Sequence, residues 1–310
     1  MITIPMLQLG LCCLNTELRS QRIFCSQTII RANFTVEKAK QLALQNIEDA
    51  ITMIKWNYQH HIFVFRLSSD MFPHFTDTET EPYSMDFAIP ALQQLGDTAR
   101  QYKQRITMHP AQFNQVGAIS KSVFEKTIAD LSYHAAILDY MNMDTSSILC
   151  IHGGGVYGDK ESTIRRWKEQ FSELPFNVRR RLAFENCERQ YSVEDALDID
   201  SDCRIPFIFD THHDACYRQL HPDYDPGTID SQLSYVVETW RDVTPLMHIS
   251  EQRPNSRVGA HSDMIETIPS YLFDLIEDGV SIDLEVEAKL KEQAIFKLYE
   301  KYPQLKKTII

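Results

Sequence analysis

The sequence predicts an α/β fold: a single (β/α)8 barrel, the TIM barrel, formed by residues 1–310. Short apolar segments alternate with helical segments along the whole chain, which is the order expected of a closed parallel barrel. A doubly wound open sheet is the alternative, but the glycine fingerprint that usually follows its first strand is absent. No linker or low-complexity run interrupts the alternation, so we expect one domain.

The expected strands are short apolar runs bounded by polar or turn-forming residues. They cover residues 7–13, 62–67, 105–109, 147–152, 181–185, 206–210, 245–249 and 281–286. Helical periodicity is clearest over residues 36–58, where apolar residues recur at steps of three and four on one face. Further helices are expected at residues 86–103, 121–141, 160–172, 192–199, 228–241, 267–277 and 286–301.

The composition indicates a globular protein, since 43% of the residues are hydrophobic and 10% are aromatic. No apolar run approaches the roughly 20 residues that a membrane span needs. The first residues lack a basic leader and are interpreted as the start of a strand, not as a signal peptide. The seven cysteines form no CxxC pair, which favours reduced thiols and a cytoplasmic or nuclear location.

The net charge of −12 argues against nucleic-acid binding, because backbone binding usually needs a basic surface. Acidic residues that bind cations would, however, be neutralised by them. The basic residues also form local groups at 165–168, at 179–181, and at Arg253 and Arg257. We interpret the first two groups as solvated helix faces. The charge therefore weakens a DNA hypothesis without excluding it.

Several of the apolar runs end on a side chain that can bind a metal, at steps of 25 to 43 residues. These residues are His109, His152, Glu185, Asp210, His248 and Glu287. Strand carboxyl ends meet at one face of a TIM barrel, where catalytic residues lie. His213 and His261 extend the set. Any one of these residues alone would be interpreted as structural, but the series together predicts a metal site.

Imidazoles mixed with carboxylates suit Zn²⁺ or Mn²⁺ better than Mg²⁺ or Ca²⁺, which prefer oxygen ligands. Asp210 and His213 are three residues apart just after a strand, so both could reach one metal or two adjacent metals. Glu185 or Glu287 could bridge two metals. Such clusters activate water and stabilise in-line displacement at phosphorus.

The longest expected loops follow strands, at residues 14–34, 68–85, 211–227 and 250–266. They would build a cleft around the metal site. The glycine run at residues 153–155 has two open interpretations. It could let a phosphate approach the backbone, or it could form a tight turn between a strand and a helix.

The sequence resembles the UV damage endonuclease family through a series of motifs in the family's order. These are LGLCCLN, FRLSSDMFP, MHPAQF, HGGGVYGDK, FEN, FDTHH, MHIS, GAHSD and EAKLKE. They run from about residue 9 to residue 293, which is nearly the whole chain. The resemblance implies a TIM barrel related to endonuclease IV, with two to three divalent metal ions, often manganese. It implies a nick in damaged double-stranded DNA immediately 5′ to a UV photoproduct.

The resemblance also implies roles for particular residues. It assigns metal binding to His109, His152, Glu185, Asp210, His213, His248, His261 and Glu287, and to Asp77, which stands where the family has a histidine. We expect the catalytic residues to be Glu185, Asp210, His213 and Glu287.

The resemblance also implies that three further residues contact the DNA. Gln112 and Phe113 stand where the family has a Gln-Tyr pair that wedges into the duplex, and Phe113 keeps the stacking surface. Asn15 matches an asparagine near the lesion pocket. Two other positions depart from the family: Leu246 replaces a lysine and Leu11 replaces a tyrosine.

Other functions remain open at this point. An abasic-site endonuclease of the endonuclease IV kind would use the same metals with a different pocket. A xylose-isomerase-like sugar isomerase shares the barrel and ligands, but the long loops and the Gln112–Phe113 pair disfavour it. A lesion-binding protein with impaired catalysis is motivated by Asp77 and Leu246. A cleft that acts on duplex DNA works as a monomer, and no membrane partner is expected.

Overall fold

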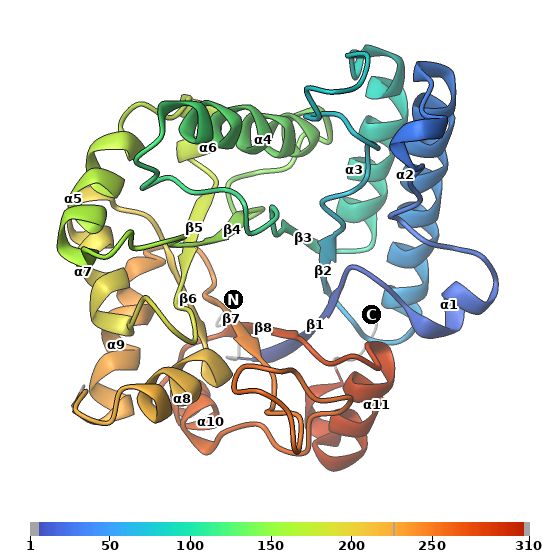
Figure 1. Ribbon diagram of the computed structural model, residues 1–310. Helices are drawn as coiled ribbons and strands as arrows, with labels where there is room; N and C mark the ends of the chain where they lie inside the picture. Colours follow the sequence, from blue (N-terminus) through green and yellow to red (C-terminus); the bar gives the residue numbers. More distant parts are fainter. Residues whose placement is uncertain (1–5, 226, 307–310) are drawn as a thin grey trace.

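Eight parallel strands close into a ring in the computed structural model, which describes residues 6–225 and 227–306 (Figure 1). Each strand pairs with the next one in the chain, and β1 pairs with β8 to complete the barrel. The strands are β1 Leu7–Cys12, β2 Val64–Leu67, β3 Arg105–Met108, β4 Leu149–His152, β5 Leu182–Glu185, β6 Phe207–Asp210, β7 Leu246–Ile249 and β8 Ile282–Val286. The predicted TIM barrel is confirmed, and every strand lies within its predicted range or matches it.

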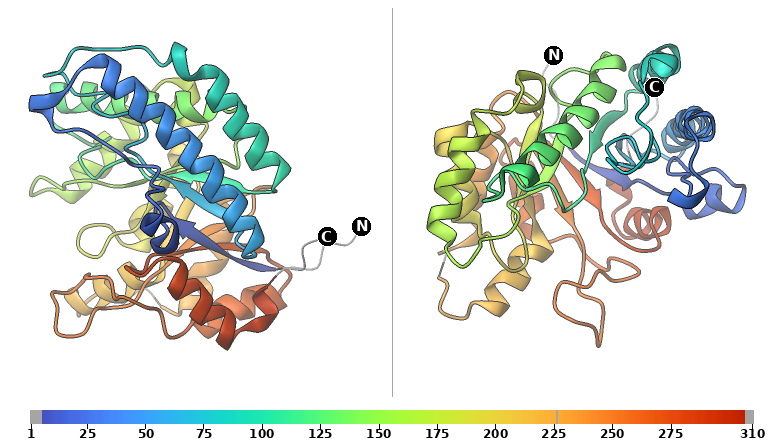
Figure 2. Two further views of the ribbon diagram at one scale, coloured as in Figure 1. Left: turned by 90° about the vertical axis from the view of Figure 1, so that its right-hand side faces the viewer. Right: turned by 45° about the horizontal axis from the view of Figure 1, so that its top comes forward.

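The helices surround the ring of strands (Figure 1). They are α1 Thr16–Ser20, α2 Val36–Gln59, α3 Ile89–Gln101, α4 Lys121–Tyr140, α5 Lys160–Phe171, α6 Phe176–Arg179, α7 Val193–Cys203, α8 Thr211–Leu220, α9 Ile229–Thr239, α10 Ser270–Glu277 and α11 Glu292–Lys301. The longest, α2, runs along the outside of the barrel (Figure 2). Among the described helices, none combines the length and apolar character that a membrane span requires.

The largest core lies between the strands and the helices, where Phe65, Phe184 and Phe207 are fully buried. The barrel interior is tightly packed around Gly10 on β1, and this packing explains why a glycine is needed at that position. A Cβ atom at this position would lie 2.9 Å from Cβ of Val64 and 3.1 Å from Cγ of Glu285. Gly10 therefore leaves space for a carboxylate side chain inside the barrel.

Residues 211–227 were predicted as a loop, and this prediction was wrong for residues 211–220, which form α8. Helix α8 begins directly after β6 because Asp210 caps it. Oδ1 of Asp210 accepts hydrogen bonds from the backbone N–H groups of His212 at 2.8 Å and His213 at 2.7 Å. This capping satisfies donors that the first turn of a helix cannot pair internally. As a result, His213 is held on a helix instead of a mobile loop.

The last helix was predicted from residue 286 but begins at Glu292. The intervening backbone is hydrogen-bonded to the segment around β7 instead. The N–H of Glu287 donates to the carbonyl of Ile249 at 2.8 Å, and the N–H of Lys289 donates to Ser262 at 3.1 Å. Lys291 then adopts a positive φ of 51° immediately before α11. The segment after β8 is therefore a structured wall beside the strand ends.

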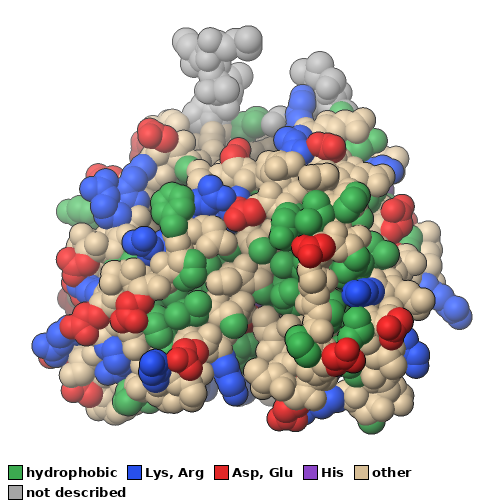
Figure 3. All heavy atoms as spheres, turned by 90° about the horizontal axis from the view of Figure 1, so that it is seen from above, with side chains coloured by type: hydrophobic (Ala, Val, Ile, Leu, Met, Phe, Trp, Pro, Cys, Tyr) green, Lys and Arg blue, Asp and Glu red, His purple; other side chains and the backbone are tan. Residues whose placement is uncertain are grey.

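Several basic side chains on the outer surface are balanced by acidic neighbours. Lys168 lies 2.9 Å from Asp198 and 2.7 Å from Asp202. Arg180 and Arg181 share Asp139. On the outer face over α4 and α6, Lys and Arg are interspersed with Asp and Glu, with no large patch of one sign (Figure 3). The predicted solvated surface is found at Arg165 and Arg180, which are exposed, but the prediction was wrong for Arg181, which is fully buried. All seven cysteines are free thiols, also as predicted.

Candidate metal centre

Glu185, at the end of β5, lies at the centre of the candidate site and is fully buried. Its Oε2 atom is 3.0 Å from Nε2 of His109 and 3.6 Å from Nε2 of His152. Its Oε1 atom is 3.0 Å from Nδ1 of His248 and 3.4 Å from Nδ1 of His213. One carboxylate therefore contacts four imidazoles from four different strand ends, as the series of strand-end residues predicts.

The remaining predicted ligands continue this network. Nδ1 of His213 is 3.9 Å from Oδ2 of Asp210. Nδ1 of His248 and Nδ1 of His261 each lie 3.5 Å from a different oxygen of Glu287. His261 comes from the loop after β7, where Gln252 forms an isolated antiparallel bridge with it. All eight of these predicted ligands are thus brought into one connected cluster of side chains. We call these eight side chains the metal cluster.

The donor atoms in this cluster fit divalent cations. Atoms within 4.8 Å of one another form three sets: His109, Cys150 and Glu185; His152, Glu185 and His213; and Glu185, Asp210 and His248. Two buried atoms, Nδ1 of His152 and Oδ2 of Asp210, have no hydrogen-bond partner among the described residues. A buried polar atom without a partner is costly, and a cation would satisfy it. Nitrogen and carboxylate donors together suit Zn²⁺ or Mn²⁺.

Charge and burial set the protonation of the cluster. Burial alone raises the pKa of the Glu185 carboxyl, but the imidazoles of His152 and His248 outweigh burial and hold that pKa well below its usual value. Burial is the main reason that the pKa of His152 is lowered, whereas at His213 and His248 the neighbouring carboxylates outweigh burial and raise the pKa. An anionic carboxylate and a neutral imidazole are the forms that bind metals.

Arg66 and Glu285 lie directly against the cluster, although the sequence analysis did not assign them to the site. Nη2 of Arg66 is 2.6 Å from Oε1 of Glu287, and its Nη1 is 3.5 Å from Oε2 of Glu285. Glu285 also contacts Nε2 of His248 at 3.1 Å and accepts a hydrogen bond from Thr107. The sequence did contain one signal for Arg66, which is a charged residue within the otherwise apolar strand VFRL. Because burying an unpaired charge is unfavourable, such a residue is expected to have a carboxylate partner inside the barrel.

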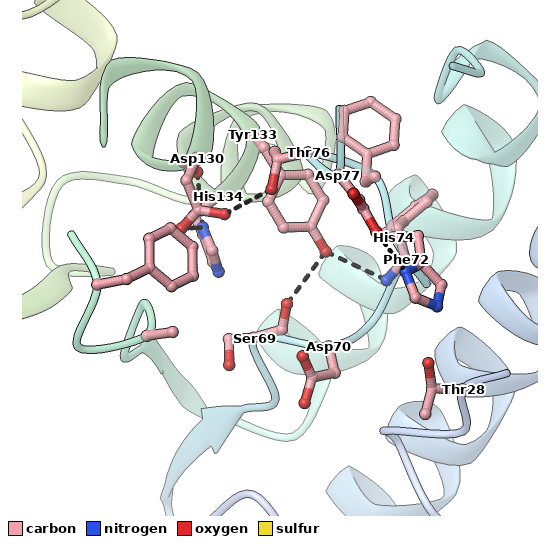
Figure 4. A pocket seen from close by; sticks show the side chains of 13 residues that line it. Thr28, Ser69, Asp70, Phe72, His74, Thr76, Asp77, Asp130, Tyr133 and His134 are labelled. Carbon is pink, nitrogen blue, oxygen red and sulfur yellow. Dashed lines mark hydrogen bonds and ion pairs between the residues drawn. The ribbon is translucent and has the colours of Figure 1, made fainter. Parts of the chain in front are cut away.

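Asp77 lies apart from the connected cluster. Its Oδ2 is 3.0 Å from Nδ1 of His74 (Figure 4) and 2.9 Å from Nη2 of Arg31. None of the three donor sets among the described residues includes it. Nε2 of His74 is also engaged, 2.6 Å from the carbonyl of Ile29. Metal binding by Asp77 would require this arrangement to change, so its assignment stays a prediction.

The structure places Gln112 and Phe113 in the loop after β3, next to two different hollows. Phe113 is 54% exposed and lines a cavity of about 320 Å³ with Asp77, Tyr133 and other residues (Figure 4). Gln112 lines a second hollow of about 210 Å³, together with His152 of the metal cluster. An exposed aromatic ring at the edge of a hollow is suited to stacking against a nucleotide base.

Asn15 follows β1 and is buried. Its Oδ1 caps α1 by accepting a hydrogen bond from the N–H of Leu18 at 2.9 Å, while its Nδ2 has no partner among the described residues. Leu246 and Leu11 are both buried in apolar clusters. Neither leucine offers a polar atom, so the family's lysine and tyrosine have no replacement at these positions.

The glycine run after β4 is explained by packing. A Cβ atom on Gly153 would lie 2.5 Å from the ring of Tyr191, which is a severe clash. Gly154 has a φ of +83°, a conformation that other residues rarely adopt. These contacts favour the tight-turn interpretation of the run.

The fold and the cluster together define a class: TIM-barrel proteins with metal-binding side chains at the strand ends. The barrel is similar to endonuclease IV from Thermus thermophilus, with a TM-score of 0.59, 13% identity and coverage of 97% of this chain and 99% of that one. It is also similar to D-psicose 3-epimerase from Clostridium cellulolyticum, with a TM-score of 0.55, 12% identity and coverage of 97% and 100%. These similarities show the fold alone.

The sequence identifies the family within this class. The family model described as UV-endonuclease UvdE matches residues 7–309, and this chain belongs to that family, as predicted. A UV-damage endonuclease of Schizosaccharomyces pombe is 34% identical over 95% of this chain and 50% of its own length. A UV DNA damage endonuclease of Bacillus cereus strain G9842 is 30% identical over 85% of this chain and 83% of its own. The crystal structure of SacUVDE matches with a TM-score of 0.84 and 28% identity, covering 97% of this chain and all of that one.

Proposed function

We propose that this protein is a metal-dependent DNA repair endonuclease that nicks the backbone 5′ to UV photoproducts. Membership of the UV-endonuclease family supports the reaction class. The observation that carries the proposal for the site is the contact of Glu185 with four imidazoles from separate strand ends. This arrangement has the donor types and the burial that a multinuclear metal site requires.

Two to three divalent ions, manganese or zinc, would be held by the eight connected residues of the cluster. When bound, such ions activate water and neutralise charge on a phosphodiester undergoing in-line displacement. The protein's own contribution is to fix the ligands. Glu185 is positioned among the imidazoles, Asp210 is held by the first turn of α8, and Arg66 orients Glu287.

Selection of damaged DNA would depend on the loop after β3. A photoproduct weakens stacking, so moving its nucleotides out of the duplex costs less than in intact DNA. Phe113 and Gln112 would fill the space left in the stack. Asn15, whose Nδ2 has no partner among the described residues, would donate a hydrogen bond near the lesion. We further propose that the protein acts as a monomer in the cytoplasm or nucleus.

The test uses three duplexes of one sequence that contain a cyclobutane dimer, an abasic site or no lesion. Each is labelled at both ends and incubated with manganese-loaded protein. The proposal expects a single nick on the 5′ side of the dimer, with a 3′-hydroxyl that a polymerase can extend. Cleavage of the abasic duplex alone would instead indicate an abasic-site endonuclease. Binding of the dimer duplex without cleavage would indicate a lesion-binding protein.

A further inference from the structure

A pocket of about 420 Å³ opens beside the metal cluster, and most of its charged residues are basic. We call it the basic pocket, and its charged side chains are Arg66, Arg257, Lys289 and Lys291, with Glu287 as the single carboxylate. Since Glu287 and the neighbouring His261 also belong to the metal cluster, the basic pocket and the metal cluster adjoin each other.

Hydrogen bonds to backbone groups hold the walls of the basic pocket in place. In the loop after β7, which projects from the barrel in Figure 2, the side chain of Gln252 donates to the carbonyl of Arg257 at 2.9 Å. The same side chain accepts from the N–H of Gly259 at 2.9 Å. The wall after β8 is joined to this loop where the N–H of Lys289 donates to Ser262 at 3.1 Å. The exposed Arg257 and Lys289 are thereby presented on two connected walls.

Three of the four basic side chains of the basic pocket are not balanced within the described part of the chain. Arg257, Lys289 and Lys291 make no ion pair with a described carboxylate, in contrast to Lys168 on the outer surface. Arg66, whose side chain is only 8% exposed, pairs with Glu287 and Glu285, but its buried Nε has no hydrogen-bond partner among the described residues. In a chain of net charge −12, such a local excess of positive charge indicates an anionic ligand.

We propose that the basic pocket binds a phosphate of the DNA backbone next to the phosphate that lies at the metal cluster. This inference rests on the proposed function, because it takes DNA as the ligand. A DNA strand that reaches the metal cluster must leave it either past Glu287 and His261 or on the opposite side. On the path past Glu287 and His261, the basic pocket offers basic side chains that have no acidic partner among the described residues. Contacts of this type fix the register of the strand without reading its sequence. They add to binding through release of counterions.

The experiment compares the metal-loaded protein with the double variant Arg257→Gln and Lys289→Gln. Binding to an undamaged duplex is measured by fluorescence anisotropy at several salt concentrations. The slope of log K against log salt should decrease in magnitude by roughly 1 to 2, since each lost phosphate contact removes about 0.9. The matched control is the double variant Lys55→Gln and Lys126→Gln, which removes two exposed lysines from α2 and α4. It should leave the slope unchanged.

An unchanged slope in the variant of the basic pocket would overturn the inference, provided that its thermal unfolding and metal content match those of the unsubstituted protein. A decrease of the same size in the control would also overturn it, because the effect would then be one of net charge. Inorganic phosphate alone is titrated as a further probe, and binding of phosphate with no effect on the DNA slope would assign the pocket to a free anion instead. Because the readout uses undamaged DNA, it is independent of whether the protein nicks irradiated DNA.

Discussion

Glu185 is the residue on which the metal cluster depends most, since it contacts four of the five histidines. We expect Glu185→Gln to lose bound metal and to lower the rate of nicking by about 100-fold or more, because an amide keeps the shape of the carboxylate but not its charge. Metal content by mass spectrometry and nicking of irradiated DNA measure the two effects.

Glu188→Gln provides the matched control, since Glu188 lies three residues further on and lines the hollow beside Gln112 without belonging to any donor set. It should retain metal. If Glu185→Gln kept its full metal content while Glu188→Gln lost it, the assignment of the cluster would be wrong.

Phe113 is the side chain that we expect to enter the duplex. Phe113→Ala should weaken binding to a dimer-containing duplex by roughly 5- to 150-fold, the equivalent of about 1–3 kcal/mol of lost stacking. Phe113→Tyr should bind within about 2-fold of the unsubstituted protein, because the ring is kept. Dissociation constants measured with a duplex that cannot be cleaved provide the comparison.

Phe176 is the control for this substitution, because it is even more exposed, at 70%, and lies on the outer helix α6. Phe176→Ala should leave DNA affinity unchanged. Equal losses for Phe113→Ala and Phe176→Ala would show that the loop after β3 has no special role.

Six of the eight residues of the metal cluster could be predicted because each ends a recognisable apolar run, and the barrel brings strand ends together. Arg66 could not be found in the same way. Its role depends on which carboxylates face it across the barrel, and this depends on strand register, which one sequence does not specify. Asp77 shows a different limit of prediction from sequence. Its position in a motif suggests a metal ligand, but the motif does not reveal that Arg31 and His74 contact its carboxylate.

At the scale of elements, the strands were easier to predict than the loops. Each strand is a short apolar run with its own boundaries, whereas α8 depends on a single capping carboxylate, Asp210. That carboxylate was interpreted only as a ligand. The delayed start of α11 depends on hydrogen bonds to residues that are far away in the sequence, such as Ile249. Such pairing overrides the helical periodicity of the local sequence.

The turn before β5 provides a test of stability at this scale. Arg181 is fully buried, and its guanidinium donates to Asp139 at 2.8 Å and to the carbonyls of Asp144 at 2.6 Å and Ser147 at 3.0 Å. Arg181→Met should lower the free energy of unfolding by about 3 kcal/mol, since these acceptors would lose their donor. Arg180→Met, at a half-exposed partner of the same Asp139, should cost less than about 1 kcal/mol. Urea denaturation measures both, and equal losses would contradict the argument.

At the scale of the whole molecule, the distribution of charge reconciles an acidic chain with DNA binding. Several carboxylates are buried candidate ligands of the metal cluster, and Lys168 and Arg180 on the outer surface are paired with acids. Of the third basic group, Arg257 lines the basic pocket beside the site. The total charge could be read from the sequence, but this division between paired and unpaired groups could not.

Metal binding should also stabilise the folded chain, since the complete cluster exists only when all strand ends are assembled. At a metal concentration 100 times the dissociation constant, the gain is about 2.7 kcal/mol per site. Manganese should therefore raise the melting temperature of the metal-stripped protein by several degrees, in proportion to the logarithm of its concentration. The Glu185→Gln variant should show a much smaller rise, and an equal rise would indicate that the metal binds elsewhere.

The most direct test of the central claim is the position of the nick in a duplex that carries one cyclobutane dimer. The account predicts that metal-loaded protein cuts the damaged strand once, on the 5′ side of the dimer, and that Glu185→Gln does not. It predicts no cut in the same duplex without the lesion. Equal cleavage of both duplexes, or full cleavage by the Glu185→Gln variant, would contradict a damage-specific reaction at this metal cluster.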